Sequence, residues 1–240
     1  MRAPAAAAPP PARAPANRPA SPAREGAAPL PIPTAPFDGI AIVGDERRAR
    51  LKVLAEQVAA CTKCELHKTR TQTVFFRGNP DAELCFVGEG PGADEDAQGE
   101  PFVGKAGQLL DKMIAGMGLD RDRDVYVANI VKCRPPGNRT PDPREMASCM
   151  PYLTEQLELI RPKAIVALGS TALRGLLGPG DGITKARGTW KLYRGTIPVM
   201  PTFHPAYVLR TPTQEVKGQV WNDLKLVLKQ LGRELPKRSG

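Results

Sequence analysis

The stretch Ala164-Ile-Val-Ala-Leu168 is apolar at every position, so neither face of this strand can meet water. Short apolar runs of this kind alternate along the chain with stretches of helical periodicity. Strands separated by helices form a parallel sheet with right-handed crossovers, and helices must cover both of its faces. We therefore expect an α/β fold, a three-layer αβα sandwich around a central four-stranded parallel sheet. The expected strands span residues 84–87, 125–131, 164–168 and 197–202, and the expected helices span residues 46–60, 104–117, 143–160, 170–177 and 214–231.

The two ends of the chain differ in composition from the middle. Among the first 36 residues 13 are Ala and 11 are Pro, so we expect residues 1–36 to form a disordered tail with little apolar surface to bury. Residues 37–231 are enough for one domain with one core, and residues 232–240 form a basic stub. The tail lacks the hydrophobic segment of a secretory signal, and no apolar run approaches the ~20 residues of a membrane span. We therefore expect a cytoplasmic protein that makes no membrane contact.

The charge balance favours a polyanionic partner without demanding one. The chain carries 34 Lys and Arg against 25 Asp and Glu, a net charge of +9. The tail accounts for +3 of this and the stub for +2, so the expected domain keeps +4. A modest positive charge of this size is compatible with nucleic acid.

Ligands of parallel sheets bind beyond the carboxyl ends of the strands, so the loops after the expected strands are the places to search. The first such loop is Gly88-Glu-Gly-Pro-Gly92, which is followed closely by the acidic residues 94–96. It formally matches a dinucleotide fingerprint, but Pro91 removes a backbone N–H and the acidic residues would repel a pyrophosphate. We interpret it as a rigid loop that lets a planar ligand approach the backbone. The alternative is a tight turn with a solvated acidic cap.

Three single side chains near these loops are candidates for ligand contact. Phe102 precedes an expected helix, and by itself it suits a core position better than a stacking surface. Asn129 lies in an apolar strand, where an unpaired amide costs about 1 to 3 kcal/mol, so it either ties loops together or meets a ligand. His204 precedes a proline at a strand end, where its imidazole either points into a cleft or is buried with its polar atoms satisfied.

Four of the five cysteines have a spacing that is typical of a metal site. Cys61 and Cys64 form a Cys-x-x-Cys pair at the end of an expected helix, Cys133 follows the second strand, and Cys149 lies in a later helix. Four thiolates from three segments can hold a [4Fe-4S] cluster or a zinc ion, and His67 keeps the zinc interpretation open. Unrelated thiols are a third possibility, while disulfides are disfavoured in a reducing compartment. We interpret Cys85, in the middle of a strand, as an inert core residue.

Several of these features belong to one ordered set: Cys61-x-x-Cys64, Gly88-Glu-Gly-Pro-Gly92, Pro101-Phe-Val-Gly104, Asn129, Lys132-Cys-Arg-Pro-Pro136, Cys149 and His204-Pro-Ala206. This set closely resembles the family 4 uracil-DNA glycosylases, the iron-sulfur branch of their superfamily, over residues 61–231. The resemblance implies an enzyme that flips deoxyuridine out of DNA and hydrolyses its N-glycosidic bond, leaving free uracil and an abasic site. It also implies a structural [4Fe-4S] cluster on the four cysteines, with His67 as an ordinary surface residue.

The resemblance also assigns roles to the residues of the expected site. Phe102 is the stacking plane, and Asn129 reads the edge of uracil and discriminates against cytosine. Glu95 forms the wall that excludes the methyl group of thymine, and His204 donates a hydrogen bond to uracil O2 as negative charge grows there. Glu89 helps to position the attacking water or the sugar, although this branch lacks the aspartate that the best-known glycosylase branch has at the position of Gly90. Gly88 and Gly90 complete the substrate-binding loop.

The implied partner is uracil-containing DNA, single- or double-stranded, bound by a monomeric protein. The loop 207–210 is expected to enter the minor groove, and the candidate phosphate contacts are Lys132, Arg134, Arg139, Arg187 and Arg210. Each of these cations can also be an ordinary solvated charge. The competing interpretation is a non-catalytic DNA-binding module with iron-sulfur or zinc. Such a module would need the cysteines and the basic residues, but not the glycine-rich loop together with Phe102, Asn129 and His204.

Overall fold

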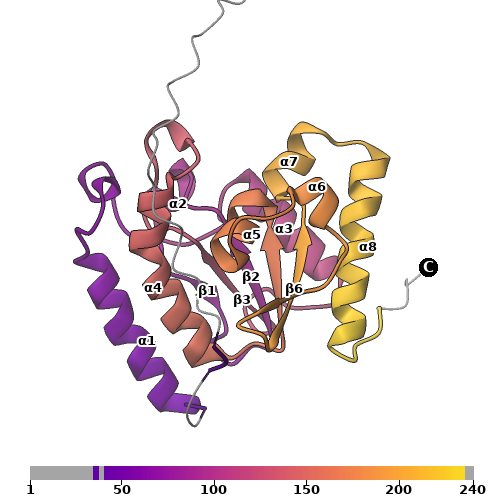
Figure 1. Ribbon diagram of the computed structural model, residues 1–240, viewed down its shortest axis with the longest axis horizontal. Helices are drawn as coiled ribbons and strands as arrows, with labels where there is room; N and C mark the ends of the chain where they lie inside the picture. Colours follow the sequence, from indigo (N-terminus) through magenta and orange to yellow (C-terminus); the bar gives the residue numbers. More distant parts are fainter. Residues whose placement is uncertain (1–34, 38–40, 236–240) are drawn as a thin grey trace, which may run out of the picture.

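The computed structural model describes residues 35–37 and 41–235, and within them the chain forms one six-stranded sheet in the order β1-β3-β2-β4-β6-β5 (Figure 1). The strands are β1 (Arg77–Gly78), β2 (Leu84–Gly88), β3 (Val125–Asn129), β4 (Ala164–Leu168), β5 (Lys191–Tyr193) and β6 (Ile197–Thr202). The middle four, β3, β2, β4 and β6, pair in parallel, whereas the edge strands β1 and β5 pair antiparallel with their neighbours. The α/β class is confirmed. The predicted number of strands is wrong, because two edge strands of two and three residues are too short to show a hydrophobic period.

Helices connect the parallel strands, as the alternating pattern predicts. They are α1 (Gly44–Ala59), α2 (Ala93–Gln98), α3 (Lys105–Gly116), α4 (Pro143–Ile160), α5 (Gly169–Leu177), α6 (Ile183–Ala186), α7 (Pro205–Arg210) and α8 (Gln214–Gln230), with short 3₁₀ turns at η1 (Glu65–Lys68) and η2 (Pro136–Asn138). All five predicted helices are present. The short helices α2, α6 and α7 were not predicted, and α7 occupies the segment that was expected to be a loop at residues 207–210.

The helices cover both faces of the sheet, because side chains alternate along each buried strand. In β2, Cys85 and Val87 pack into one core with residues of α1, α4 and α5, while Leu84 and Phe86 pack into a second core with residues of α3 and α8. Figure 1 shows α1 and α4 on one side of the sheet and α8 on the other. This arrangement has the three layers that the sequence predicts.

Helix α4 begins with a strong local signal. The Asp142 carboxylate accepts hydrogen bonds from the backbone N–H groups of Arg144 and Glu145, both at 2.8 Å, and Pro143 occupies the first helical position. The Glu145 carboxylate in turn accepts from the Asp142 N–H at 2.8 Å and from the guanidinium of Arg139. These contacts fix the end of α4 that lies next to the loop after β3.

The carboxyl ends of the four parallel strands lie at one edge of the sheet, and the segments that follow them carry the candidate site. None of the helices in residues 41–235 is both long enough and apolar enough to cross a membrane. The predicted domain, residues 37–231, falls almost entirely within the described part. Residues 1–34 of the predicted tail and residues 236–240 of the predicted stub lie outside the described part.

Candidate active site and cysteine cavity

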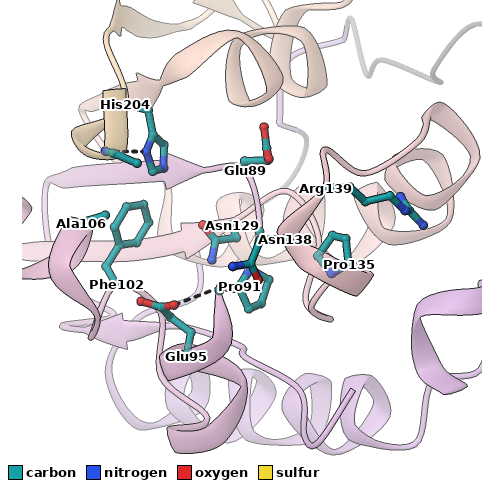
Figure 2. Close-up of a pocket in the computed structure, with 13 residues that line it drawn as sticks. Glu89, Pro91, Glu95, Phe102, Ala106, Asn129, Pro135, Asn138, Arg139 and His204 are labelled. Carbon is teal, nitrogen blue, oxygen red and sulfur yellow. Dashed lines mark hydrogen bonds between the residues drawn. The ribbon is translucent and has the colours of Figure 1, made fainter. Parts of the chain in front are cut away.

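A cavity of about 240 Å³ opens beyond the carboxyl ends of β2 and β3 (Figure 2). Six of the residues predicted for substrate binding or catalysis line it: Glu89, Gly90, Glu95, Phe102, Asn129 and His204. The remaining lining residues are Pro91, Gly92, Ala106, Pro135, Asn138, Ala206 and Arg139, of which only Arg139 was predicted, as a phosphate contact. The structure therefore brings together side chains that are up to 117 positions apart in the chain.

Phe102 is held in the cavity by an unusual backbone conformation. Its φ is 59°, in the left-handed region, and only 4% of the residue is exposed. A β-carbon on Gly107 would lie 1.7 Å from the Phe102 carbonyl oxygen, and one on Gly88 would lie 2.5 Å from the Phe102 ring. The ring centroid lies 5.6 Å from that of His204, with 28° between the two planes. Gly88 and Gly107 are thus required for the ring to occupy this place. Gly88, which was predicted for substrate binding, is not among the residues that line the cavity, but it makes room for one that does.

Asn129 is the last residue of β3 and is 2% exposed. Its side-chain oxygen Oδ1 is buried and has no hydrogen-bond partner among the described residues. A buried amide oxygen without a partner is costly, so its presence at the wall of a cavity indicates that a ligand completes it. The backbone carbonyl of Asn129 is already engaged, because it accepts a hydrogen bond from Lys132 Nζ at 2.8 Å. The sequence left open whether Asn129 ties loops or meets a ligand, and this geometry favours the ligand.

His204 caps the start of α7 with its own ring. Its Nδ1 accepts a hydrogen bond from the Ala206 N–H at 3.1 Å, so the neutral ring carries its proton on Nε2. Burial, aided by the charge of Arg210, lowers the pKa of His204 from 6.5 to about 4. The imidazole is therefore neutral at pH 7 and offers one N–H donor at the cavity. The structure supports the cleft interpretation over that of a satisfied core histidine.

Glu95 braces the loops around the cavity. Its carboxylate accepts hydrogen bonds from the backbone N–H groups of Gly92 at 3.0 Å, Val103 at 3.0 Å and Gly104 at 2.9 Å. Figure 2 shows the bond from Gly92. These bonds join the start of α2 to the segment that carries Phe102. The sequence allowed Glu95 to be part of a solvated acidic cap or a wall of the ligand site. In the structure it is a fixed part of the cavity lining.

Glu89 follows β2 and lines both the cavity and a larger groove of about 620 Å³ that adjoins it. The groove shares Gly90, Asn138, His204 and Ala206 with the cavity and continues towards α5 and α7. The Glu89 carboxylate accepts a hydrogen bond from the hydroxyl of Thr171, in the first turn of α5. Glu89 therefore stands where the cavity opens into the groove.

One of the five predicted phosphate contacts is wrong, and a second is paired inside the fold. Lys132 is completely buried, and its ammonium donates to the Asn129 carbonyl rather than facing solvent. Arg187 has a side chain that is only 16% exposed, and it pairs with the buried carboxylate of Asp223 at 2.6 Å. Both cations are used inside the fold, and the fully buried ammonium of Lys132 cannot reach a DNA backbone.

The other three predicted cations remain near the openings. Arg139 lines the cavity with a side chain 45% exposed, although it also pairs with Glu145 at 2.6 Å. Arg210 is exposed and lines the adjoining groove, and Arg134 is half-buried with its Nε donating to Asn138 Oδ1 at 2.8 Å. Their role as phosphate contacts stays a prediction.

The four cysteines predicted as ligands, Cys61, Cys64, Cys133 and Cys149, line one small cavity between α1, α4 and the loop after β3. Arg70 connects two of the segments, donating to the Cys61 carbonyl oxygen at 2.8 Å and to Cys133 Sγ at 3.1 Å. The Lys132 N–H donates to Cys149 Sγ at 3.3 Å. Cys85 lies in β2 and is fully buried in the core, as predicted.

Burial disfavours the charged form of the thiols in this cavity. Burial raises the pKa of the Cys133 thiol, and it raises the pKa of the Cys149 thiol to about 12. Thiolates form at such positions when a metal group binds them. In the described part of the chain, no three or more His, Cys, Asp or Glu side chains are arranged to hold a single metal ion. His67 lines the same cavity, but its Nδ1 lies 2.7 Å from the Cys64 carbonyl oxygen.

Sequence reasoning missed Thr171, Asn138 and Arg70. Thr171 lies in an ordinary helical stretch, and Arg70 follows the Cys-x-x-Cys pair without a pattern of its own. Asn138 had a local signal, because Gly137-Asn138 is a turn dipeptide and both residues adopt positive φ. The contacts of the other two depend on segments far away in the chain.

The comparisons with known proteins agree with this geometry. Residues 75–225 match the model of the uracil DNA glycosylase superfamily. The type-4 uracil-DNA glycosylase of Thermotoga maritima is 47% identical over 75% of this chain and 93% of its own length. The type-4 uracil-DNA glycosylase of Archaeoglobus fulgidus is 42% identical over 76% of this chain and 94% of its own length. That of Sulfurisphaera tokodaii is 46% identical over 68% of this chain and 77% of its own length. The chain belongs to the type-4 uracil-DNA glycosylase family. The cavity of this glycosylase is therefore the place where its chemistry has to be sought.

Proposed function

We propose that this protein excises uracil from DNA by hydrolysing the N-glycosidic bond of deoxyuridine, which leaves an abasic site and free uracil. The observation that carries the proposal is that Phe102, Asn129 and His204 line one cavity. At about 240 Å³ the cavity lies below the roughly 300 to 1,000 Å³ of most small-molecule sites, so it suits a single flipped base better than a larger ligand. The type-4 relatives are named for this activity.

Recognition of uracil follows from the donor and acceptor pattern of Asn129. Its unpaired Oδ1 accepts the N3–H of uracil, and its amide NH₂ donates to O4. Cytosine presents the reverse pattern, so it would leave both amide groups without partners at a cost of several kcal/mol. Flipping the base costs a few kcal/mol, which stacking on Phe102 and these edge hydrogen bonds offset.

Exclusion of thymine requires a wall beside C5 of the base, because thymine differs from uracil only in its methyl group there. Glu95 lines the cavity, and three backbone N–H groups hold its carboxylate. A side chain fixed in this way cannot move aside for a methyl group. This rigidity supports Glu95 as the wall.

The bond-breaking step generates negative charge on the departing uracil and positive charge on the sugar. His204 supplies a neutral Nε2–H donor, which we assign to uracil O2, where the charge grows. A neutral donor held in place before the reaction needs no reorganisation as that charge develops. Glu89 lies at the mouth of the cavity with a carboxylate that can orient water or stabilise the sugar cation.

We include a [4Fe-4S] cluster in the proposal, because the four thiols that line the cysteine cavity are the donor set of such a cluster. The thiols surround a common cavity, and two cations, Arg70 and Lys132, contact or face them. Positive charge beside thiolates favours a cluster whose complex with four cysteines is negative. When bound, the cluster cross-links the three segments that carry the cysteines and takes no part in bond cleavage.

DNA is the partner that this function requires. Arg139 at the cavity and Arg210 in the adjoining groove flank the route by which a flipped nucleotide would enter. Phosphate contacts of this kind position the strand without reading its sequence. We therefore expect binding to weaken steeply as the salt concentration rises.

The proposal is tested by incubating the full-length protein with single-stranded and duplex oligonucleotides that carry one uracil. Strand scission at the uracil after alkali treatment is the expected result, because an abasic site is alkali-labile. Oligonucleotides with cytosine or thymine at the same position should stay intact. Binding without scission would instead support a non-catalytic DNA-binding module and overturn the proposal.

The matched variant for this assay is Asn129→Ala. It removes the edge contacts, so uracil excision should fall by about 100-fold or more while the brown absorbance of the cluster is kept. Excision at the wild-type rate would remove Asn129 from the recognition of uracil.

A further inference from the structure

The Glu89 side chain is held by a residue that belongs to a different element. Its backbone is fixed by the sheet, since the Glu89 carbonyl accepts a hydrogen bond from the Val131 N–H at 3.1 Å. Its carboxylate accepts from the Thr171 hydroxyl, 82 positions further along the chain. Within the described residues, no other group donates a hydrogen bond to this carboxylate. The direction of the Glu89 side chain therefore depends on Thr171.

Thr171 is itself firmly placed. It is 8% exposed and lies in the first turn of α5, which follows β4 directly. Glu89 comes from the loop after β2, the strand beside β4 in the sheet. Neighbouring parallel strands thus deliver the carboxylate and the hydroxyl to the same edge, and the hydrogen bond joins the two segments there.

The hydrogen bond from Thr171 leaves one of the two carboxylate oxygens of Glu89 available to another partner. Thr171 donates to Oε2, so Oε1 has no partner among the described residues. The residue lines both the cavity and the groove, so a carboxylate held through one oxygen can present the other to the reacting sugar or a water. A glutamate side chain has three rotatable bonds, and each freely rotating bond would dilute this orientation.

A purely structural explanation would make Glu89 a cap for the N-terminus of α5. In that case its carboxylate would accept from backbone N–H groups of the first turn. The contact in the structure is made by a side-chain hydroxyl instead, and the N-cap position of α5, Leu168, has no side-chain cap bond. The geometry favours orientation of the carboxylate over capping of the helix.

We propose that Thr171 is a positioning residue that holds the Glu89 carboxylate in its working orientation. This inference rests on the proposed function and on the role of Glu89 within it. Thr171 does not touch the substrate in this scheme, and it acts only through Glu89. Its removal should therefore slow the chemical step and leave the binding of uracil-containing DNA unchanged.

The first test compares Thr171→Val, which keeps the shape of the side chain but loses the hydroxyl, with Thr171→Ser, which keeps the hydroxyl. In single-turnover assays, Thr171→Val should lower the rate of excision about tenfold or more, with less than about a twofold change in DNA affinity. Thr171→Ser should retain nearly the wild-type rate. Equal rates for both variants, or a loss that appears only in affinity, would contradict the proposal. If Thr171→Val fails to fold, Thr171→Ala takes its place.

The decisive test is a double-mutant cycle with Glu89→Ala. If Thr171 acts through the carboxylate, adding Thr171→Val to Glu89→Ala should change the excision rate less than about twofold. Additive losses would show that Thr171 acts independently of Glu89 and would overturn the inference. Full activity of Glu89→Ala alone would also overturn it, while uracil excision itself would stand. Absence of excision by the wild-type protein would instead reject the proposed function.

Discussion

At the scale of single residues, the cavity is prepared before a base enters it. The Nδ1 of His204 is engaged by a backbone N–H, so the proton of the neutral ring is on Nε2. The Oδ1 of Asn129 is buried without a partner, and Phe102 is held in a left-handed backbone conformation. The unpaired amide oxygen and the left-handed backbone of Phe102 each destabilise the free protein slightly. Each also removes a rearrangement that binding or catalysis would otherwise require.

The neutral state of His204 predicts a specific pH dependence of stability. Its pKa is about 4 in the folded protein and near 6.5 when the chain is unfolded. Between these values the unfolded chain binds the extra proton, so the free energy of unfolding should fall as the pH is lowered from 6.5 towards 4. The variant His204→Gln should show a smaller decrease, measured by urea unfolding at several pH values without DNA. If the free energy of unfolding depended on pH in the same way in both proteins, the pKa of His204 would not be lowered by folding.

At the scale of elements, α4 links the two functional cavities. Its first turn is capped by Asp142 and Glu145, and Glu145 also holds Arg139, which lines the base-sized cavity. Its second turn carries Cys149, which lines the cysteine cavity. The fixed start of this helix therefore sets the position of residues at both sites.

This role of the helix start predicts the effect of Asp142→Ala. Loss of the cap leaves two N–H groups of the first turn without their side-chain acceptor, so the free energy of unfolding should decrease by about 1 kcal/mol. The measurement is urea unfolding of the protein isolated with its metal content intact. The control is Glu155→Ala, an exposed acidic residue of the same helix, which should change stability by less than about 0.5 kcal/mol. Equal effects of the two variants would argue against the cap.

At the scale of the whole molecule, the cysteine cavity joins segments that the sheet alone does not hold together. Cys61 and Cys64 follow α1, Cys133 lies in the loop after β3, and Cys149 lies in α4. Buried Lys132 lies between this cavity and the Asn129 carbonyl, so the two cavities share one wall. A cluster in the cysteine cavity would therefore stabilise the segment that carries Asn129.

The proposed ligand set predicts different results for two cysteine substitutions. Cys64→Ala should lower the content of iron and acid-labile sulfide per protein and reduce the melting temperature, because a cross-link between segments is lost. Cys85→Ala, which removes a thiol from the core of β2, should keep the full iron and sulfide content. Metal analysis and thermal unfolding measure both effects. Full iron and sulfide in Cys64→Ala would exclude Cys64 from the ligand set.

The sequence by itself determined the layering of the fold, the principal strands and helices, and six of the residues that line the cavity. These features follow from local rules, since the period of apolar residues defines each element and parallel strands place their following loops at one edge. Asn129 and His204 were candidates because they end or follow such strands, whereas Phe102, which precedes a helix, became a candidate only through the family resemblance. The short edge strands β1 and β5 carry no period and were missed for that reason.

Only the tertiary structure decided which charges face solvent and which partners distant side chains meet. Lys132 and Arg187 have the sequence context of surface cations, yet one is buried beside the cysteine cavity and the other pairs with Asp223. The bond between Thr171 and Glu89 joins the first turn of α5 to the loop after β2, two segments that neighbouring strands bring together. Burial and hydrogen bonding of a side chain depend on elements far away in the chain, and a local pattern carries no information about them.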